Sequence, residues 1–98
     1  MVHDMVVGVC TLTLDIPHSN SLKDKRQVVK SVIARVRNHF NVSIAEVDAN
    51  DVWRCAVIGI ACVSNDPARA HAVLERVVQM IGSSRLDAQV ADYEIEIV

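Results

Sequence analysis

Positively charged side chains are concentrated in one short segment of this 98-residue chain. Between residues 22 and 39, six cations stand against a single acid, Asp24, so the segment carries +6 − 1 = +5. The formal net charge of the whole chain is −2, which leaves −7 for the remainder. The six cations are Lys23, Lys25, Arg26, Lys30, Arg35 and Arg37. Clustered Lys and Arg side chains attract phosphates, so this segment is the first candidate for a binding surface.

The same segment has the apolar spacing of a helix that runs from Leu22 to about His39. Ser21 precedes it as an N-cap, and Asp24 at the third helical position predicts a weaker version of the capping box. Because these two residues satisfy the start of the helix, its first turn can tolerate cations that the macrodipole disfavours.

Four of the cations form a stripe along this helix. At about 100° per residue, their side chains fall within about 60° of arc, beside the apolar face. Such a stripe can follow the phosphates of a nucleic-acid backbone. Lys25 points into the apolar sector, so its ammonium must reach the helix rim or contact a nearby loop. The candidate nucleic-acid- or anion-binding residues are therefore Lys23, Lys25, Arg26, Lys30 and Arg37. The alternative interpretation is a solvated face that keeps the domain soluble.

Apolar, β-branched runs and helical patterns are arranged in the order β-α-β-β-α-β. Pro67, directly after the capping acid Asp66, marks the start of the second helix, and Gly82 is a suitable stop. The expected strands cover residues 5–16, 41–49, 53–64 and 87–98, around helices at 22–39 and 67–82. This order predicts one domain over residues 1–98. Its fold class is α+β: a ferredoxin-like βαββαβ sandwich, with a four-stranded antiparallel sheet and two helices on one face.

The first and third strands are apolar on both faces, which predicts that they are central, whereas charged alternation predicts that the second and fourth are edges. Because helices cover only one face of such a sheet, apolar residues on the other face are open to water. We therefore expect a homodimer or larger homo-oligomer, formed through the open sheet face or through an edge strand.

Other kinds of chemistry find little support in the sequence. The four histidines have no metal-ligand spacing, and the three cysteines, which sit in strand-like runs, are expected to be buried structural thiols. The loop after the first strand has cations but none of the glycines with which small acylphosphatases, of the same fold and size, cradle phosphate. We therefore expect a non-enzymatic protein with no catalytic residues, no metal and no cofactor.

Three further residues have alternative interpretations. Trp53 is interpreted as a packing residue that caps one end of the core, or otherwise as a binding anchor at the rim. Glu46 and Asp48 are interpreted as neighbours on the exposed face of an edge strand, or otherwise as a carboxylate pair, for which the sequence offers no partner acid or base. With one Phe, one Tyr and one Trp, the chain has too few aromatics to stack bases on its sheet as an RRM does. Double-stranded or folded RNA, recognised through its phosphates and shape, is the alternative target.

Three stretches resemble the YlxP-like family of small bacterial proteins, a domain of unknown function (503). They are "SLKDKR" at 21–26, "RVRNHFNVSIAE" at 35–46, and Trp53 followed by "AVIGIACVS" at 56–64. The resemblance covers nearly the whole chain and implies a ferredoxin-like fold. It also implies ribosome or RNA association, because genes of the family often lie beside those of translation and ribosome-maturation factors. Besides the start of the basic helix, it marks as motif positions without a known role Asn41, Ser43, Glu46 and Trp53.

These observations predict a non-enzymatic protein that associates with RNA or a ribosomal particle through its basic first helix. The alternative is a dimeric regulatory or scaffold module that binds a small anionic ligand. No apolar run approaches the roughly 20 residues of a membrane span, and the start lacks the pattern of a signal peptide. We therefore expect no membrane contact and a cytoplasmic location.

Overall fold

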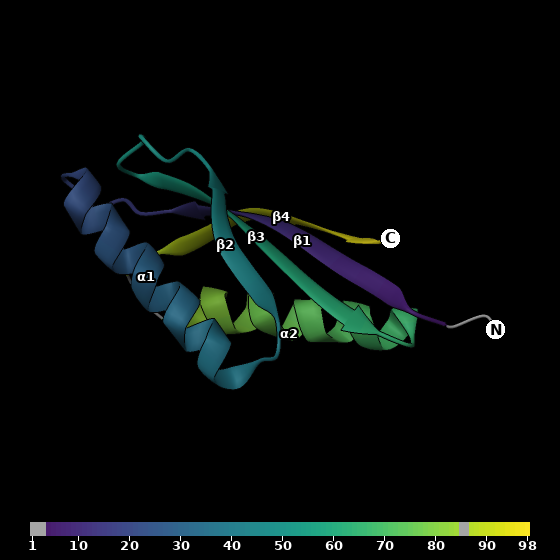
Figure 1. Cartoon of the computed structure of the whole chain (residues 1–98). Coiled ribbons are helices and arrows are strands. Elements are labelled where there is room, and N and C mark those ends of the chain that lie inside the picture. The colour runs from purple at the N-terminus through teal and green to yellow at the C-terminus, as the bar shows by residue number, and fades with distance from the viewer. Residues whose placement is uncertain (1–3, 85–86) are drawn as a thin grey trace.

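The computed structural model describes residues 4–84 and 87–98. Its elements follow the predicted β-α-β-β-α-β order (Figure 1). In sequence they are β1 (Val6–Asp15), α1 (Leu22–His39), β2 (Ser43–Asp48), β3 (Cys55–Ser64), α2 (Pro67–Ser84) and β4 (Gln89–Ile97). The first helix has the predicted bounds, and each strand is shorter than predicted by two or three residues in total.

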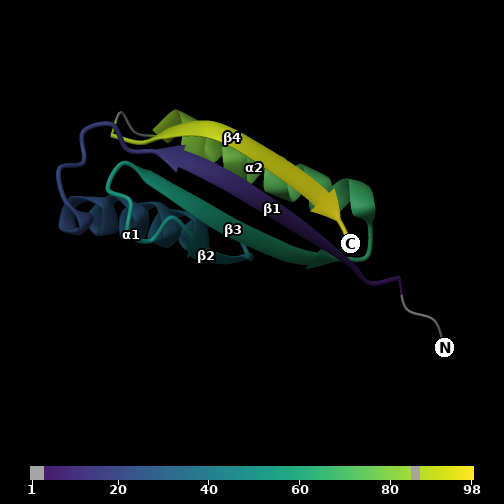
Figure 2. The same ribbon diagram turned by 90° about the horizontal axis from the view of Figure 1, so that it is seen from above.

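The four strands form one antiparallel sheet with the order β2-β3-β1-β4. The two strands predicted to be central are central, and β2 and β4 are the edges. Both helices lie on the same side of the sheet, as Figures 1 and 2 show from two directions. This architecture confirms the predicted ferredoxin-like sandwich.

The core lies between the helices and one face of the sheet. Alternate residues of β1 and β3 point into it, and the register pairs Cys10 with Ile60 and Leu12 with Ile58. α2 approaches β1 closely at Gly8, where an added Cβ would lie 2.9 Å from a methyl group of Leu74. Across the sheet and both helices, the largest fully buried apolar side chains are Leu12, Leu14, Ile16, Val36, Ile58, Leu74 and Val77.

The start of α1 is built as the sequence predicts. The backbone N–H of Asp24 donates to the Ser21 hydroxyl at 3.0 Å, which is the N-cap bond. The Asp24 carboxylate accepts from the N–H of Asn20, one residue before the cap, so the box is closed one position earlier than in the usual motif. Asp66 likewise caps α2 by accepting from the N–H of Ala68 at 3.0 Å.

The end of α2 differs from the prediction, because the helix continues past Gly82 to Ser84. A glycine ends a helix when it adopts the left-handed conformation. Among the described residues no glycine has a positive φ, so Gly82 keeps a helical backbone and does not act as the stop.

The open face of the sheet carries the apolar residues that the helices do not cover. Val63 and Met5 are 69% and 68% exposed, and Val47 is 59% exposed. Along β4 the same face is acidic, since Glu94 and Glu96 pair with Thr11 and Val9 of β1. In the described part of the chain, neither helix has the length and apolarity that a membrane crossing requires.

Candidate nucleic-acid interface

Four of the five predicted anion-contacting residues are exposed on α1: Lys23, Arg26, Lys30 and Arg37. We call them the basic stripe. Within residues 4–84 and 87–98, ion pairs join Lys25 with Glu46 and His71 with Glu75, and none includes a stripe residue. The carboxylate nearest along the chain, Asp24, is occupied by the Asn20 N–H. The positive charge of the stripe is therefore available to an external anion.

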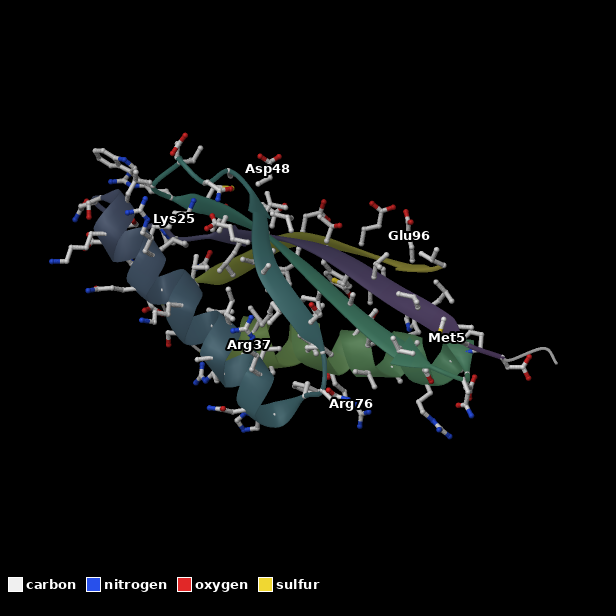
Figure 3. All side chains as sticks on the ribbon, in the orientation of Figure 1. Met5, Lys25, Arg37, Asp48, Arg76 and Glu96 are labelled. Atoms are coloured by element: carbon white, nitrogen blue, oxygen red, sulfur yellow. The ribbon has the colours of Figure 1, made fainter. Side chains whose placement is uncertain are left out.

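A groove of about 430 Å³ separates α1 from the edge strand β2. Arg26, Lys30 and Arg37 line it from the helix, so it contains three of the four stripe cations. The rest of its lining is Val29, Ile33, Ile44 and Ala45, together with Glu46, whose carboxylate is paired with Lys25. The Arg37 guanidinium donates to the carbonyl of Ile44 at 3.2 Å and thereby spans the groove at one end (Figure 3).

Lys25 lies apart from the stripe. Its side chain is 1% exposed and occupies the core face of α1 with Val29, Val32 and Val36. Its Nζ lies 2.8 Å from Oε2 of Glu46 and donates to the carbonyl of Ala49. The helical wheel placed Lys25 in the apolar sector, and this is where the structure has it. Its charge is therefore directed at internal partners and away from solvent.

Glu46 and Asp48 do not share a face, which corrects the prediction. Glu46 pairs with Ile58 and points toward the helices, where its side chain is 17% exposed. A β-bulge between Glu46 and Asp48 shifts the register, so Asp48 pairs with Val57 and projects from the side of the sheet away from the helices (Figure 3). Glu46 is the partner of Lys25 and not an exposed edge-strand acid.

The loop that joins β2 to β3 is fixed against the start of α1. The Arg54 guanidinium donates to the Ser19 carbonyl at 2.9 Å and to Oδ1 of Asn20 at 3.4 Å. At its other end, the loop is held by the Lys25 ammonium on the Ala49 carbonyl. Trp53 lies on this loop and is 51% exposed, so the interpretation as a core-capping residue is wrong.

The two remaining motif residues, Asn41 and Ser43, are exposed where α1 leads into β2. Together with Arg37 they line a shallow hollow of about 540 Å³, whose other wall is the end of β3 at Ala61 and Val63. Arg37 therefore borders both the groove beside the stripe and this hollow.

A cluster of titratable groups between α2 and β4 was not predicted. The Tyr93 hydroxyl lies 3.2 Å from a carboxylate oxygen of Glu75, and this hydrogen bond raises the pKa of Tyr93. Burial, helped by the Glu75 charge, raises the pKa of Cys10 to about 11. A nucleophilic cysteine needs a lowered pKa, so this thiol is a packing residue. The only signal of this cluster in the sequence is the i, i+4 spacing of His71 and Glu75.

The cysteines follow the prediction in part. Cys10 and Cys62 are buried free thiols, whereas Cys55 at the start of β3 is half-buried. Among the residues that the structure describes, no three His, Cys, Asp or Glu side chains are grouped as a metal ion would need.

The fold and this interface together define the protein as a ferredoxin-like α+β protein with a basic helix beside a sheet edge. The family model "Protein of unknown function (DUF503)" matches residues 7–95. The chain therefore belongs to the DUF503 family, as its resemblance to the YlxP-like proteins predicted. It is 38% identical over 78 residues to "Uncharacterized protein YlxP" of Bacillus subtilis (strain 168), covering 80% of this chain and 85% of that protein.

Solved structures with low sequence identity share the fold. A de novo designed protein, Foldit4, superimposes with a TM-score of 0.53 at 13% identity, over 96% of both chains. A C-terminal segment of the alpha subunit of aIF2 from Pyrococcus abyssi gives the same TM-score at 16% identity. All of this chain is covered in that comparison, and it spans about half (51%) of the segment. These likenesses concern the fold alone.

Proposed function

We propose that this protein is a non-enzymatic RNA-binding protein whose basic stripe contacts the phosphate backbone, with ribosomal RNA or a ribosomal particle as its target. The observation that carries the proposal is the set of four exposed cations along one face of α1. None of them is neutralised by a carboxylate in the described part of the chain. Cations without a carboxylate partner on one face of a helix can bind the phosphates of a nucleic-acid backbone.

The dimensions of the stripe suit a short length of backbone. Lys23 and Arg37 are 14 residues apart, which corresponds to about 21 Å at 1.5 Å per residue. The groove beside the stripe gives the backbone a track with cations on its helix side. At most four phosphates can be paired by these side chains, so we expect affinity that is modest and strongly dependent on salt.

The mode of binding differs from that of an RRM, in which aromatics on the open face of the sheet stack bases. Here the only tyrosine, Tyr93, pairs with Leu12 and contacts Glu75 of α2, and Phe40 packs against the core. The helix side of the molecule is therefore the better candidate surface, and the ribosomal target is what the family resemblance adds.

The test compares two variants that lose the same charge. K23Q/K30Q removes two stripe cations, and R69Q/R76Q removes two exposed cations of α2. At about 0.5–1 kcal/mol per exposed contact, K23Q/K30Q should bind a labelled ribosomal RNA fragment about 5- to 30-fold more weakly than the wild type. R69Q/R76Q should bind within about twofold of it. Equal losses in both variants would mean that net charge and not the stripe governs binding.

A small anion is the second candidate ligand, favoured by the same groove with Arg26, Lys30 and Arg37 on its wall. It is distinguished by a thermal-shift titration with inorganic phosphate and nucleoside monophosphates. A rise in melting temperature with one of these, abolished by R26Q, together with absence of RNA binding, would favour this function over the first.

A further inference from the structure

We propose that Trp53 is a stacking platform for an unpaired base of the RNA that the basic stripe holds. This inference rests on the proposed function and narrows its target to RNA with a single-stranded segment. It makes the β2–β3 loop, and not the sheet, the part of the molecule that distinguishes single strands from duplexes.

The exposure of Trp53 is not explained by packing. Trp53 is 51% exposed, and its neighbour Val52 is 49% exposed. A large indole left in water forgoes the hydrophobic gain that its burial would bring. Exposed aromatics next to cations are the usual means by which proteins hold single-stranded nucleic acid, because every base has a face that can stack.

The loop presents the indole on a fixed support. The residue that follows it, Arg54, is held by the Ser19 carbonyl through its guanidinium, and the Arg54 carbonyl accepts from the N–H of Ile16 at 2.9 Å. Ala49, at the beginning of the loop, has a φ of 61° and receives the buried Lys25 ammonium on its carbonyl. A platform anchored at both ends requires little ordering when a base binds, which favours affinity.

The position of the loop places the platform at one end of the stripe. Arg54 contacts Ser19 and Asn20, which immediately precede the N-cap of α1, and the stripe begins at Lys23. Figures 1 and 2 both show the β2–β3 connection beside the first turn of α1. A strand whose phosphates follow the stripe would therefore reach the loop as it passes the helix start.

The charges of the loop favour a base over a phosphate at this point. Asp48 and Asp51 flank it, and both are exposed. Asp48 accepts from the N–H of Ala49 at 2.7 Å, which keeps its carboxylate beside the loop backbone. These acids repel a phosphate, whereas the uncharged face of a base meets no such penalty. The backbone is thus guided to the stripe and the base to Trp53.

The experiment uses the fact that Trp53 is the only tryptophan, so its fluorescence reports on this position alone. The probes are an oligouridylate of about 12 nucleotides and an RNA duplex of the same length. We expect the single strand to quench the fluorescence and to bind more tightly than the duplex. Because the Trp53 variants lack the indole, their binding is followed by the fluorescence anisotropy of end-labelled RNAs. W53A should weaken binding of the single strand about 5- to 100-fold, as the loss of one stacked base predicts, and leave duplex binding within about twofold. W53F, which keeps a ring, should retain part of the affinity.

The outcomes separate this inference from the proposed function. If both RNAs bind without quenching, or if W53A binds the single strand as tightly as the wild type does, the stacking role of Trp53 is contradicted. The RNA-binding role of the basic stripe is unaffected by that result. If neither RNA binds, the proposed function fails and the platform with it. If an oligoglutamate of equal charge quenches and competes as well as the single strand, the loop recognises a polyanion and not a base. Thermal unfolding of each variant shows whether it is folded.

Discussion

Lys25 shows how one residue of a basic cluster can serve the fold and not the ligand. Its neighbours Lys23 and Arg26 are exposed, whereas its own side chain is 1% exposed and contacts Glu46 and the Ala49 carbonyl. A buried cation is tolerated only when a charge and a hydrogen-bond acceptor replace water. Lys25 has both, which explains why the first turn of α1 can include a lysine on its core side.

Cys10 carries a prediction at the scale of the residue. Burial raises the pKa of its thiol to about 11, so at pH 8 only about 0.1% of it is thiolate. We expect iodoacetamide at pH 8 to modify the half-buried Cys55 of the native protein well before Cys10, as peptide mass spectrometry would show. Because the folded-state pKa is above its usual value of 9.0, the thiol stabilises the fold below pH 9 and this contribution is lost as the pH rises through about 11. Equal labelling of Cys10 and Cys55 in the native protein would contradict the expected order of modification.

At the scale of the elements, the Lys25–Glu46 pair joins α1 to β2. K25M should lower the free energy of unfolding by about 2–3 kcal/mol, because it leaves a carboxylate with only 17% exposure unpaired. K23M, two residues earlier and on the exposed side of the helix, should change the free energy of unfolding by less than about 0.5 kcal/mol. Urea denaturation measures both.

The control for this prediction is the double variant K25M/E46L. Replacing both charges by apolar side chains removes the unpaired carboxylate, so most of the lost stability should return. A double variant as unstable as K25M would mean that the Ala49 hydrogen bond, and not the pair, is the stabilising contact.

The elements themselves could be predicted because their patterns are local. The N-cap at Ser21 and the apolar spacing of α1 defined the helix, and two-sided hydrophobicity identified the central strands. Features that depend on distant contacts could not be predicted. The bulge that separates Glu46 from Asp48 arises from pairing with β3. The β2–β3 loop that carries Trp53 is held by Arg54 binding the carbonyl of Ser19, 35 residues earlier in the chain. The basic stripe was readable from sequence, whereas the groove beside it needed the position of β2.

At the scale of the whole molecule, self-association remains a prediction. The open face presents Val63, Met5 and Val47, each more than half exposed, and a second copy of this face could cover them. We expect the wild type to sediment as a dimer at about 0.1 mM and V63E to sediment as a monomer, because the carboxylate would be desolvated at the contact. V52E is the matched control, since Val52 lies on the β2–β3 loop. A monomeric wild type, or V52E with the same effect as V63E, would contradict an open-face contact.

The two sides of the molecule, the open face of the sheet and the helix side, differ in charge. The open face is acidic along β4, where Glu94 and Glu96 lie, and the helix side carries the stripe. Under the proposed function, an RNA would be repelled by the acidic edge of one side and attracted by the cations of the other. The proposed polyanion site is thus compatible with a net charge of −2, because the positive charge is concentrated on one side.

The most direct test of that claim is the salt dependence of RNA binding. Affinity of the wild type for a single-stranded RNA is measured over a series of salt concentrations. With three to four phosphate contacts, log K against log salt should fall with a slope of about −2 to −3, and K23Q/K30Q should flatten it by about 1.4. Absence of salt-sensitive binding in the wild type, or an unchanged slope in the variant, would contradict the proposal that α1 is an RNA-binding helix.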